Sequence, residues 1–194
     1  MMKKNLIRKL PAFILYFLLS LTVNLHSQGG HLMIVGGGTE YNDTPNTWNH
    51  DAYTWAVNHA ANRKVAVLHY STTSAWLEDY FVNHCGANEA DSYAIGAGQA
   101  NDGALIETLS DYDMFFLRGG DQWNYYDYWK GSDLERLLEQ KFAEGALLAG
   151  TSAGLAVLSG VIYNAENASA YTDHSIKNID HTSHTLADDF FPFV

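Results

Sequence analysis

Residues 146–159 read ALLAGTSAGLAVLS, in which a glycine-containing segment separates two mostly apolar runs. The apolar run at 146–149 has the length of a short buried strand, and residues 150–154 form a Gly-x-Ser-x-Gly turn. The following residues, 155–159, are compatible with a helix. The stretch therefore predicts a strand, a tight turn and a helix, which is a unit of an α/β fold.

The chain before this unit repeats the same alternation. Short apolar segments precede it at 31–35, 64–70, 92–95 and 113–117. Helix-length stretches lie at 47–62, 73–84, 101–110 and 132–144, and the last has Leu134, Leu137, Leu138 and Phe142 on one face. Strands that alternate with helices predict parallel strands joined by right-handed crossovers. We expect one α/β domain with a doubly wound, mostly parallel sheet of the flavodoxin-like kind.

The composition excludes several classes of protein. The chain has 194 residues, of which 47% are hydrophobic, and carries 22 acidic against 11 basic residues, for a net charge of -11. An excess of acid makes nucleic acid an unsuitable partner, because phosphate backbones are bound by clustered Lys and Arg. The single cysteine, Cys85, can form neither an intrachain disulfide nor a multi-cysteine metal site.

The first 27 residues have the pattern of a signal peptide. Residues 1–9 are basic, residues 10–23 are apolar but short for a bilayer span, and Ser27 is a small residue suited to cleavage. An uncleaved membrane anchor is the alternative. Cleavage leaves 7 basic and 22 acidic residues, a net charge of -15. We therefore expect residues 28–194 to form the mature domain, exported to the periplasm or outside the cell, with no stable membrane span.

The turn at 150–154 carries the strongest chemical signal. A serine between two glycines, after a strand and before a helix, is typical of a nucleophile elbow, which lifts the hydroxyl above the sheet. Ser152 is the candidate nucleophile, and the N–H of Ala153 is a candidate donor to an oxyanion. The alternative is a tight turn in which Ser152 only caps the helix.

A second glycine cluster, Gly119-Gly120-Asp121-Gln122, follows the strand at 113–117. Neighbouring parallel strands end at one edge, so Gly120 is a candidate second oxyanion donor, and Gln122 can bind a substrate amide or carboxylate. The alternatives are a turn glycine and a residue that starts a helix. The glycines at 36–38 lack the spacing of a phosphate loop, so we expect no nucleotide site there.

Together these motifs resemble the cyanophycinases of the S51 serine peptidases, relatives of dipeptidase E with a class I glutamine amidotransferase-like fold. Residues 163–173 also resemble an exported bacterial branch of that family. The resemblance implies a hydrolase that cleaves peptide or isopeptide bonds at aspartyl residues, such as β-aspartyl-arginine. It implies Ser152 as nucleophile and the amides of Gly120 and Ala153 as oxyanion hole. Gln122, with Gly119 and Asp121 beside it, becomes the candidate substrate-binding group.

The resemblance leaves the rest of the triad open. Asp173 is the first candidate for its acid and Glu166 the second. The relatives carry an Asp-x-His segment beyond the position of residues 190–194, so we expect the chain to be a fragment of a longer protein. Otherwise the base is one of His174, His181 and His184, or the chain is a noncatalytic peptide-binding module.

The remaining expectations concern ligands and partners. The proposed chemistry needs no cofactor and no metal. Asp173, Asp180, His181 and His184 are residue types that bind metals, and a metal site formed by them is the alternative. The expected partner is a peptide substrate that carries arginine, because the acidic surface suits a cation. The relatives are often oligomeric, so the resemblance is consistent with a homo-oligomer.

Overall fold

The computed structural model describes residues 29–37, 48–74, 76–188 and 190–191, and the expected signal peptide at 1–27 lies outside this part of the chain. A parallel sheet of five strands, in the order β1-β5-β4-β2-β3, organises the fold. Its strands are β1 (His31–Val35), β2 (Lys64–His69), β3 (Glu89–Ala94), β4 (Met114–Leu117) and β5 (Leu147–Thr151). The predicted parallel α/β sheet is confirmed.

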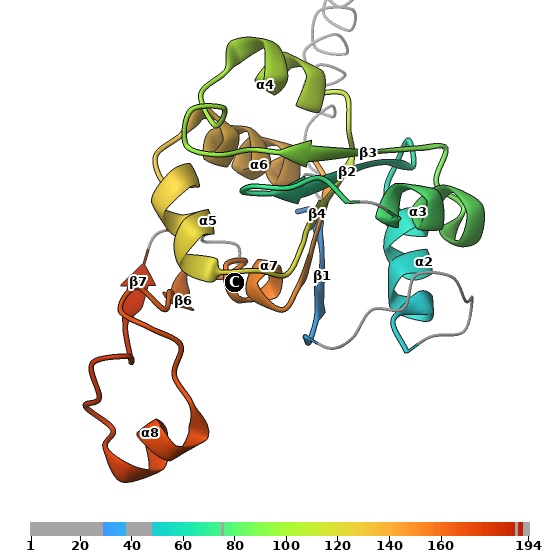
Figure 1. The fold of residues 1–194 in the computed structure, drawn as a ribbon. Coiled ribbons are helices and arrows are strands. Elements are labelled where there is room, and N and C mark those ends of the chain that lie inside the picture. The colour runs from blue at the N-terminus through green and yellow to red at the C-terminus, as the bar shows by residue number, and fades with distance from the viewer. Residues whose placement is uncertain (1–28, 38–47, 75, 189, 192–194) are drawn as a thin grey trace, which may run out of the picture.

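Helices cover both faces of this sheet, as Figure 1 shows. One layer holds α2 (His50–His59) and α3 (Leu77–Cys85). The other layer holds α4 (Gly103–Leu109), α5 (Gln122–Trp129), α6 (Asp133–Ala143) and the short α7 (Ala153–Ala156). Helices on both faces make the sheet doubly wound, as the alternating sequence predicted.

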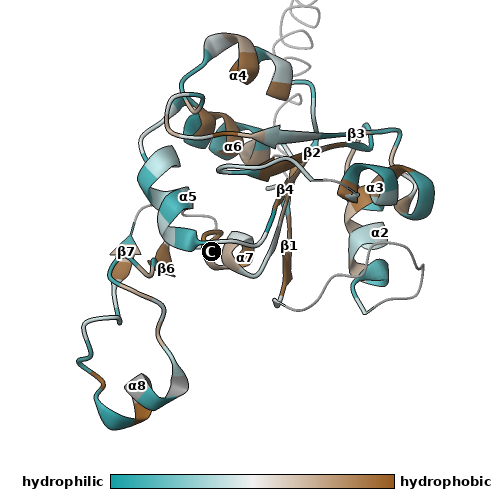
Figure 2. Cartoon of the chain, viewed as in Figure 1, coloured by the Kyte–Doolittle hydropathy of each residue, from teal (hydrophilic) through white to brown (hydrophobic). Residues whose placement is uncertain are grey.

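Side chains alternate across β4, which lies in the middle of the sheet. Met114 and Phe116 join the core beneath α2 and α3, whereas Phe115 and Leu117 join the core beneath α5 and α6. All four are fully buried, and Figure 2 shows the central strands in the brown of apolar residues. A continuous apolar run is what a parallel strand covered on both faces requires.

Helix α6 illustrates how local sequence sets an element. Ser132 caps its first turn by accepting a hydrogen bond from the N–H of Glu135, and Leu134, Leu137 and Leu138 are buried on one face. The sequence predicted this helix and its apolar face. In contrast, the sequence placed the start of β3 at residue 92, and the strand starts at Glu89. The polar start was missed because β3 is an edge strand that pairs only with β2.

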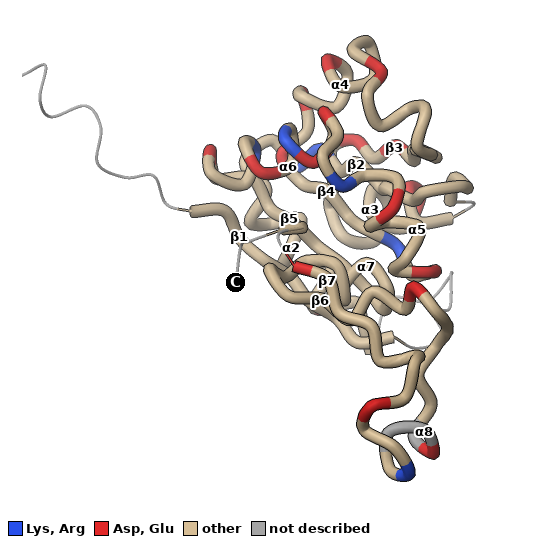
Figure 3. The backbone as a smooth tube through the Cα atoms, turned by 90° about the vertical axis from the view of Figure 1, so that its left-hand side faces the viewer, with Lys and Arg blue, Asp and Glu red and all other residues tan. Residues whose placement is uncertain are grey.

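Four elements were not predicted. Besides α5, they are the antiparallel pair β6 (Val161–Tyr163) and β7 (Leu186–Asp188), and α8 (Thr172–Lys177) between them. In Figures 1 and 3 the segment with α8 extends away from the sheet and its covering helices. None of the helices within the described ranges is long and apolar enough to cross a bilayer.

Candidate active site

Ser152 occupies the sharp turn between β5 and α7. Its backbone has φ 53° and ψ -119°, so this non-glycine residue lies in the left-handed region. Such a conformation costs on the order of 1–3 kcal/mol and persists only where the surroundings impose it. Ser152 is exposed, while Thr151 and Ala153 on either side are buried. The turn therefore presents the hydroxyl at the surface, as the elbow motif predicted.

Two glycines from neighbouring strand ends lie against Ser152. A Cβ added to Gly37, which follows β1, would lie 3.0 Å from Ser152 Oγ. A Cβ added to Gly119, which follows β4, would lie 3.2 Å from Ser152 Cβ. Because β5 lies between β1 and β4, both flanks of the serine are formed by backbone without side chains. From the sequence we expected no nucleotide site at residues 36–38, and we did not predict that Gly37 contacts Ser152. This contact arises because β1 and β5 are neighbours in the sheet.

We expect a methyl group at position 37 to slow reactions at Ser152. Gly37→Ala places a carbon against Oγ, whereas Gly36→Ala adds a carbon with no atom within 4 Å. A reacting group displaced by a fraction of an ångström loses near-attack geometry, so we expect Gly37→Ala to lower the fluorophosphonate labelling rate about 10-fold or more. Gly36→Ala should stay within about 2-fold of wild type. Equal rates for the two variants would contradict this placement.

Two amide groups beside the serine are available as donors. The N–H groups of Gly120 and Ala153 make no hydrogen bond to any part of the chain that the structure describes. Gly119, rather than Gly120, is the diglycine residue in contact with Ser152, while Gly120 faces His69 and Tyr70. The structure thus brings Gly119 beside Ser152, and within the described residues both predicted oxyanion donors are unengaged.

The polar residues after the diglycine start helix α5. Asp121 caps this helix by accepting a hydrogen bond of 2.9 Å from the N–H of Trp123, and its own N–H donates to the Tyr70 hydroxyl at 3.1 Å. Gln122 is the first helical residue and is half-buried. The carboxylate of Asp121 therefore has a structural partner, and the substrate-binding roles of Asp121 and Gln122 stay predictions.

His69 is a buried residue of this site that the sequence analysis missed. It ends β2 and stacks on Tyr70, with ring centroids 4.1 Å apart. Its Nδ1 accepts hydrogen bonds of 3.1 Å from the N–H groups of both Ser71 and Thr72. Burial and then the Arg118 guanidinium lower the pKa of His69 below 6.5, against a smaller opposing effect of a backbone hydrogen bond with Gly119. A lone histidine that follows the apolar run of β2 was the available sequence signal.

The lowered pKa of His69 has a consequence for stability. Below about pH 6.5 the unfolded chain takes up a proton at this histidine before the folded chain does, so folding is disfavoured as pH falls. We expect the free energy of unfolding from urea titrations to fall more between pH 7.5 and 5.5 for wild type than for His69→Asn. The two proteins differ only at residue 69, so the difference between their pH profiles isolates His69. Parallel pH profiles would contradict the shift.

The candidates for the triad acid and base lie on the segment that carries α8. Asp173 is exposed and pairs with Lys177 at 3.6 Å within α8, and Glu166 is also exposed. His181 and His184 lie in the loop after α8, where the Nδ1 of His184 lies 2.8 Å from the carbonyl of Ile179. In Figures 1 and 3, α8 is well separated from α7, the helix that follows Ser152. The structure does not bring Asp173 beside the serine, and its assignment as triad acid stays a prediction.

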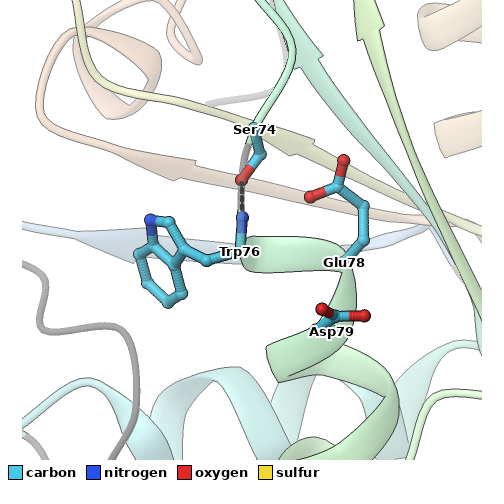
Figure 4. A pocket seen from close by; sticks show the side chains of 4 residues that line it. All are labelled: Ser74, Trp76, Glu78 and Asp79. Carbon is cyan, nitrogen blue, oxygen red and sulfur yellow. Dashed lines mark hydrogen bonds between the residues drawn. The ribbon is translucent and has the colours of Figure 1, made fainter.

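A hollow of about 200 Å³ opens where β2 passes into α3. Figure 4 shows its lining side chains, Ser74, Trp76, Glu78 and Asp79, with Ser74 Oγ accepting from the N–H of Trp76 at 3.2 Å. None of these is a candidate catalytic residue. Within the described residues, no group of three or more His, Cys, Asp or Glu is placed to hold a metal ion.

Comparison with known proteins gives the family. The sequence matches peptidase family S51 over residues 32–190. A peptidase from an acI-B1 Actinobacterium aligns with a TM-score of 0.56 and 18% identity over 69% of this chain, which spans 58% of that protein. A protein of Listeria monocytogenes EGD-e assigned to peptidase E aligns with a TM-score of 0.50 and 15% identity, over 80% of this chain and 73% of that protein.

These two structures share the fold, and no curated protein matches the sequence. The family match covers the strand ends that carry Gly37, Gly119 and Ser152. It also covers the elbow and the diglycine segment on which the resemblance to serine peptidases was based. The chain belongs to peptidase family S51, a family of serine peptidases.

Proposed function

We propose that this protein is an exported serine peptidase of the cyanophycinase type, which cleaves peptide or isopeptide bonds at aspartyl residues. The observation that carries the proposal is the backbone of Ser152, held at φ 53° in an exposed turn. A strained, non-glycine residue at the end of a central parallel strand is what a nucleophile elbow requires.

The proposed reaction follows from the groups around the turn. Ser152 Oγ attacks the scissile carbonyl while its proton passes to a base, and the N–H groups of Gly120 and Ala153 stabilise the resulting oxyanion. The tetrahedral intermediate expels the amine, which takes that proton, and leaves an ester on Ser152. Water then adds to the ester and releases the acid. We propose that the base is a histidine, as the resemblance to the family implies.

Charge supports a cationic substrate. Acidic residues outnumber basic ones by 22 to 11 in the whole chain, and Figure 3 shows few Lys and Arg along the described backbone. A negative surface attracts cations and speeds their encounter with the protein. An arginine beside the scissile aspartyl bond, as in β-aspartyl-arginine units, fits this charge.

The decisive test uses the protein encoded by its complete reading frame. It is incubated with an aspartate-arginine polymer, with an α-linked Asp-Arg peptide and with a β-Asp-Lys analogue, and products are identified by mass spectrometry. We expect release of β-aspartyl-arginine, which the Ser152→Ala variant should not produce. Cleavage of the α-linked peptide alone would be consistent with a serine peptidase but would contradict the proposed specificity for isopeptide bonds.

A noncatalytic peptide-binding module is the second candidate function. It is favoured by one observation, namely that no side chain within the described ranges hydrogen-bonds to Ser152 Oγ. A serine without a base is a poor nucleophile. This alternative predicts that the full-length protein binds the aspartate-arginine polymer without releasing any product. Turnover that depends on Ser152 would exclude it.

A further inference from the structure

The diglycine segment lies between Ser152 and the side chains of His69, which ends β2, and Tyr70, which follows it. Gly119 contacts Ser152 on one side. On the other side, a Cβ added to Gly120 would lie 2.9 Å from His69 Nε2 and 3.0 Å from the Tyr70 hydroxyl. Gly120 has φ 153°, so both the space and the backbone conformation exclude a side chain here. Whatever fixes this segment also fixes one side of the serine.

The hydrogen bonds of His69 determine where its proton lies. Backbone N–H groups can only donate, and two of them, from Ser71 and Thr72, point at Nδ1. Nδ1 must therefore be the unprotonated nitrogen, which leaves the proton of the neutral ring on Nε2. That nitrogen faces the diglycine segment, where a Cβ added to Gly120 would lie 2.9 Å from it. The backbone of Gly119 acts to raise the pKa of His69, which is the effect of a carbonyl that accepts from the ring. The Gly119 carbonyl is therefore the acceptor that we assign to Nε2–H.

The orientation of one peptide group follows from this bond. No cis peptide is present in the described chain, and the C=O and N–H of a trans peptide point in opposite directions. If the Gly119 carbonyl points to His69, the N–H of Gly120 points away from it. Gly119 contacts Ser152, so this orientation leaves the N–H of Gly120 free to serve an oxyanion that forms at the serine.

Neighbouring contacts hold His69 itself in place. The Arg118 guanidinium donates to the carbonyl of Thr72 at 3.1 Å, which ties the turn after β2 to the end of β4. The Tyr125 hydroxyl donates to the Arg118 carbonyl at 2.8 Å, and its ring lies edge-on to that of His69. The imidazole is thus fixed from its own turn, from β4 and from α5.

We propose that His69 is a positioning residue that holds the Gly119–Gly120 peptide so that the N–H of Gly120 serves as an oxyanion donor for Ser152. The proposal rests on the proposed serine peptidase function and adds a residue that acts through the backbone, without touching substrate. It assigns the buried end of β2 a part in the reaction, although β2 is separated from β5 by β4.

Two substitutions separate the two nitrogens of the ring. Asparagine places its carbonyl oxygen near the position of Nδ1, so His69→Asn keeps an acceptor for the Ser71 and Thr72 amides and removes the donor to Gly119. Glutamine places its amide nitrogen near the position of Nε2, so His69→Gln keeps that donor. The pair distinguishes support of the turn from orientation of the diglycine.

The test measures inactivation of the full-length protein by a fluorophosphonate, whose phosphoryl oxygen enters the oxyanion hole. For His69→Asn we expect kinact to fall about 10-fold or more while KI stays within about 2-fold, because a lost oxyanion donor acts mainly on the reacting state. His69→Gln should recover kinact to within about 3-fold of wild type. An unchanged kinact in His69→Asn, or an equal loss in both variants, would overturn the proposal.

A second measurement needs no variant. Long-range ¹H–¹⁵N correlation spectra of the wild-type imidazoles report the tautomer, and we expect His69 to carry its proton on Nε2 at pH 7. A proton on Nδ1, or on both nitrogens, would overturn the proposal even if a variant failed to fold. A wild-type protein that is not inactivated would instead refute the peptidase function, so the two failures are distinguishable.

Discussion

We expect Ser152→Ala to abolish covalent labelling by fluorophosphonates and to lower peptide hydrolysis by about 10³-fold or more, because it removes the proposed nucleophile that forms the acyl intermediate. Alanine retains the Cβ and therefore the strained backbone at φ 53°. The free energy of unfolding should consequently change little. Labelling followed by gel fluorescence and mass spectrometry of the modified peptide gives the readout.

Two further serine-position variants sharpen this result. Ser152→Gly also removes the hydroxyl, but it relieves the left-handed strain, so we expect a gain of about 1 kcal/mol in the free energy of unfolding. Ser110→Ala is the matched control, since Ser110 is an exposed serine whose hydroxyl bonds only to the carbonyl of Glu107. Ser110→Ala should label like wild type. Full labelling of Ser152→Ala would place the nucleophile elsewhere.

We expect Gly154→Ala to cause a large loss of stability. A Cβ at this position would lie 2.1 Å from the carbonyl oxygen of Leu117 and 2.7 Å from that of Arg118. Both are backbone atoms of the segment that ends β4, and they cannot give way as a flexible side chain does. Forcing α7 and β4 apart should cost about 3 kcal/mol, at the upper end of overpacking effects.

Urea denaturation of Gly154→Ala beside Gly103→Ala measures this cost. Gly103 begins α4, and a Cβ there has no atom within 4 Å, so alanine should be neutral or stabilise by about 0.5 kcal/mol. Gly154→Ala should also slow labelling of Ser152, because the turn is displaced with α7. A Gly154→Ala protein as stable as wild type would mean that α7 does not pack on β4 as described.

The local patterns of the sequence were sufficient for the five strands of the parallel sheet and for the sharp turn at Ser152. The apolar runs at β2, β4 and β5 each report burial on both faces, which depends only on the residues themselves, whereas β1 lies at an edge of the sheet and leaves Ile34 exposed. The Gly-x-Ser-x-Gly pattern likewise describes a turn within five neighbouring residues. Helix α5 was missed because its aromatic residues, which include the buried Tyr125 and Trp129, do not form the usual amphipathic pattern.

What the sequence by itself determined is therefore the parallel α/β architecture, the elbow at Ser152 and the diglycine segment beside it. Only the tertiary structure decided that Gly37 lies against Ser152 and that His69 lies against the diglycine segment. The strand order β1-β5-β4-β2-β3 creates these contacts between residues far apart along the chain. Periodicity and turn chemistry act over a few neighbouring residues, whereas the neighbours of a strand are chosen by the packing of the whole core.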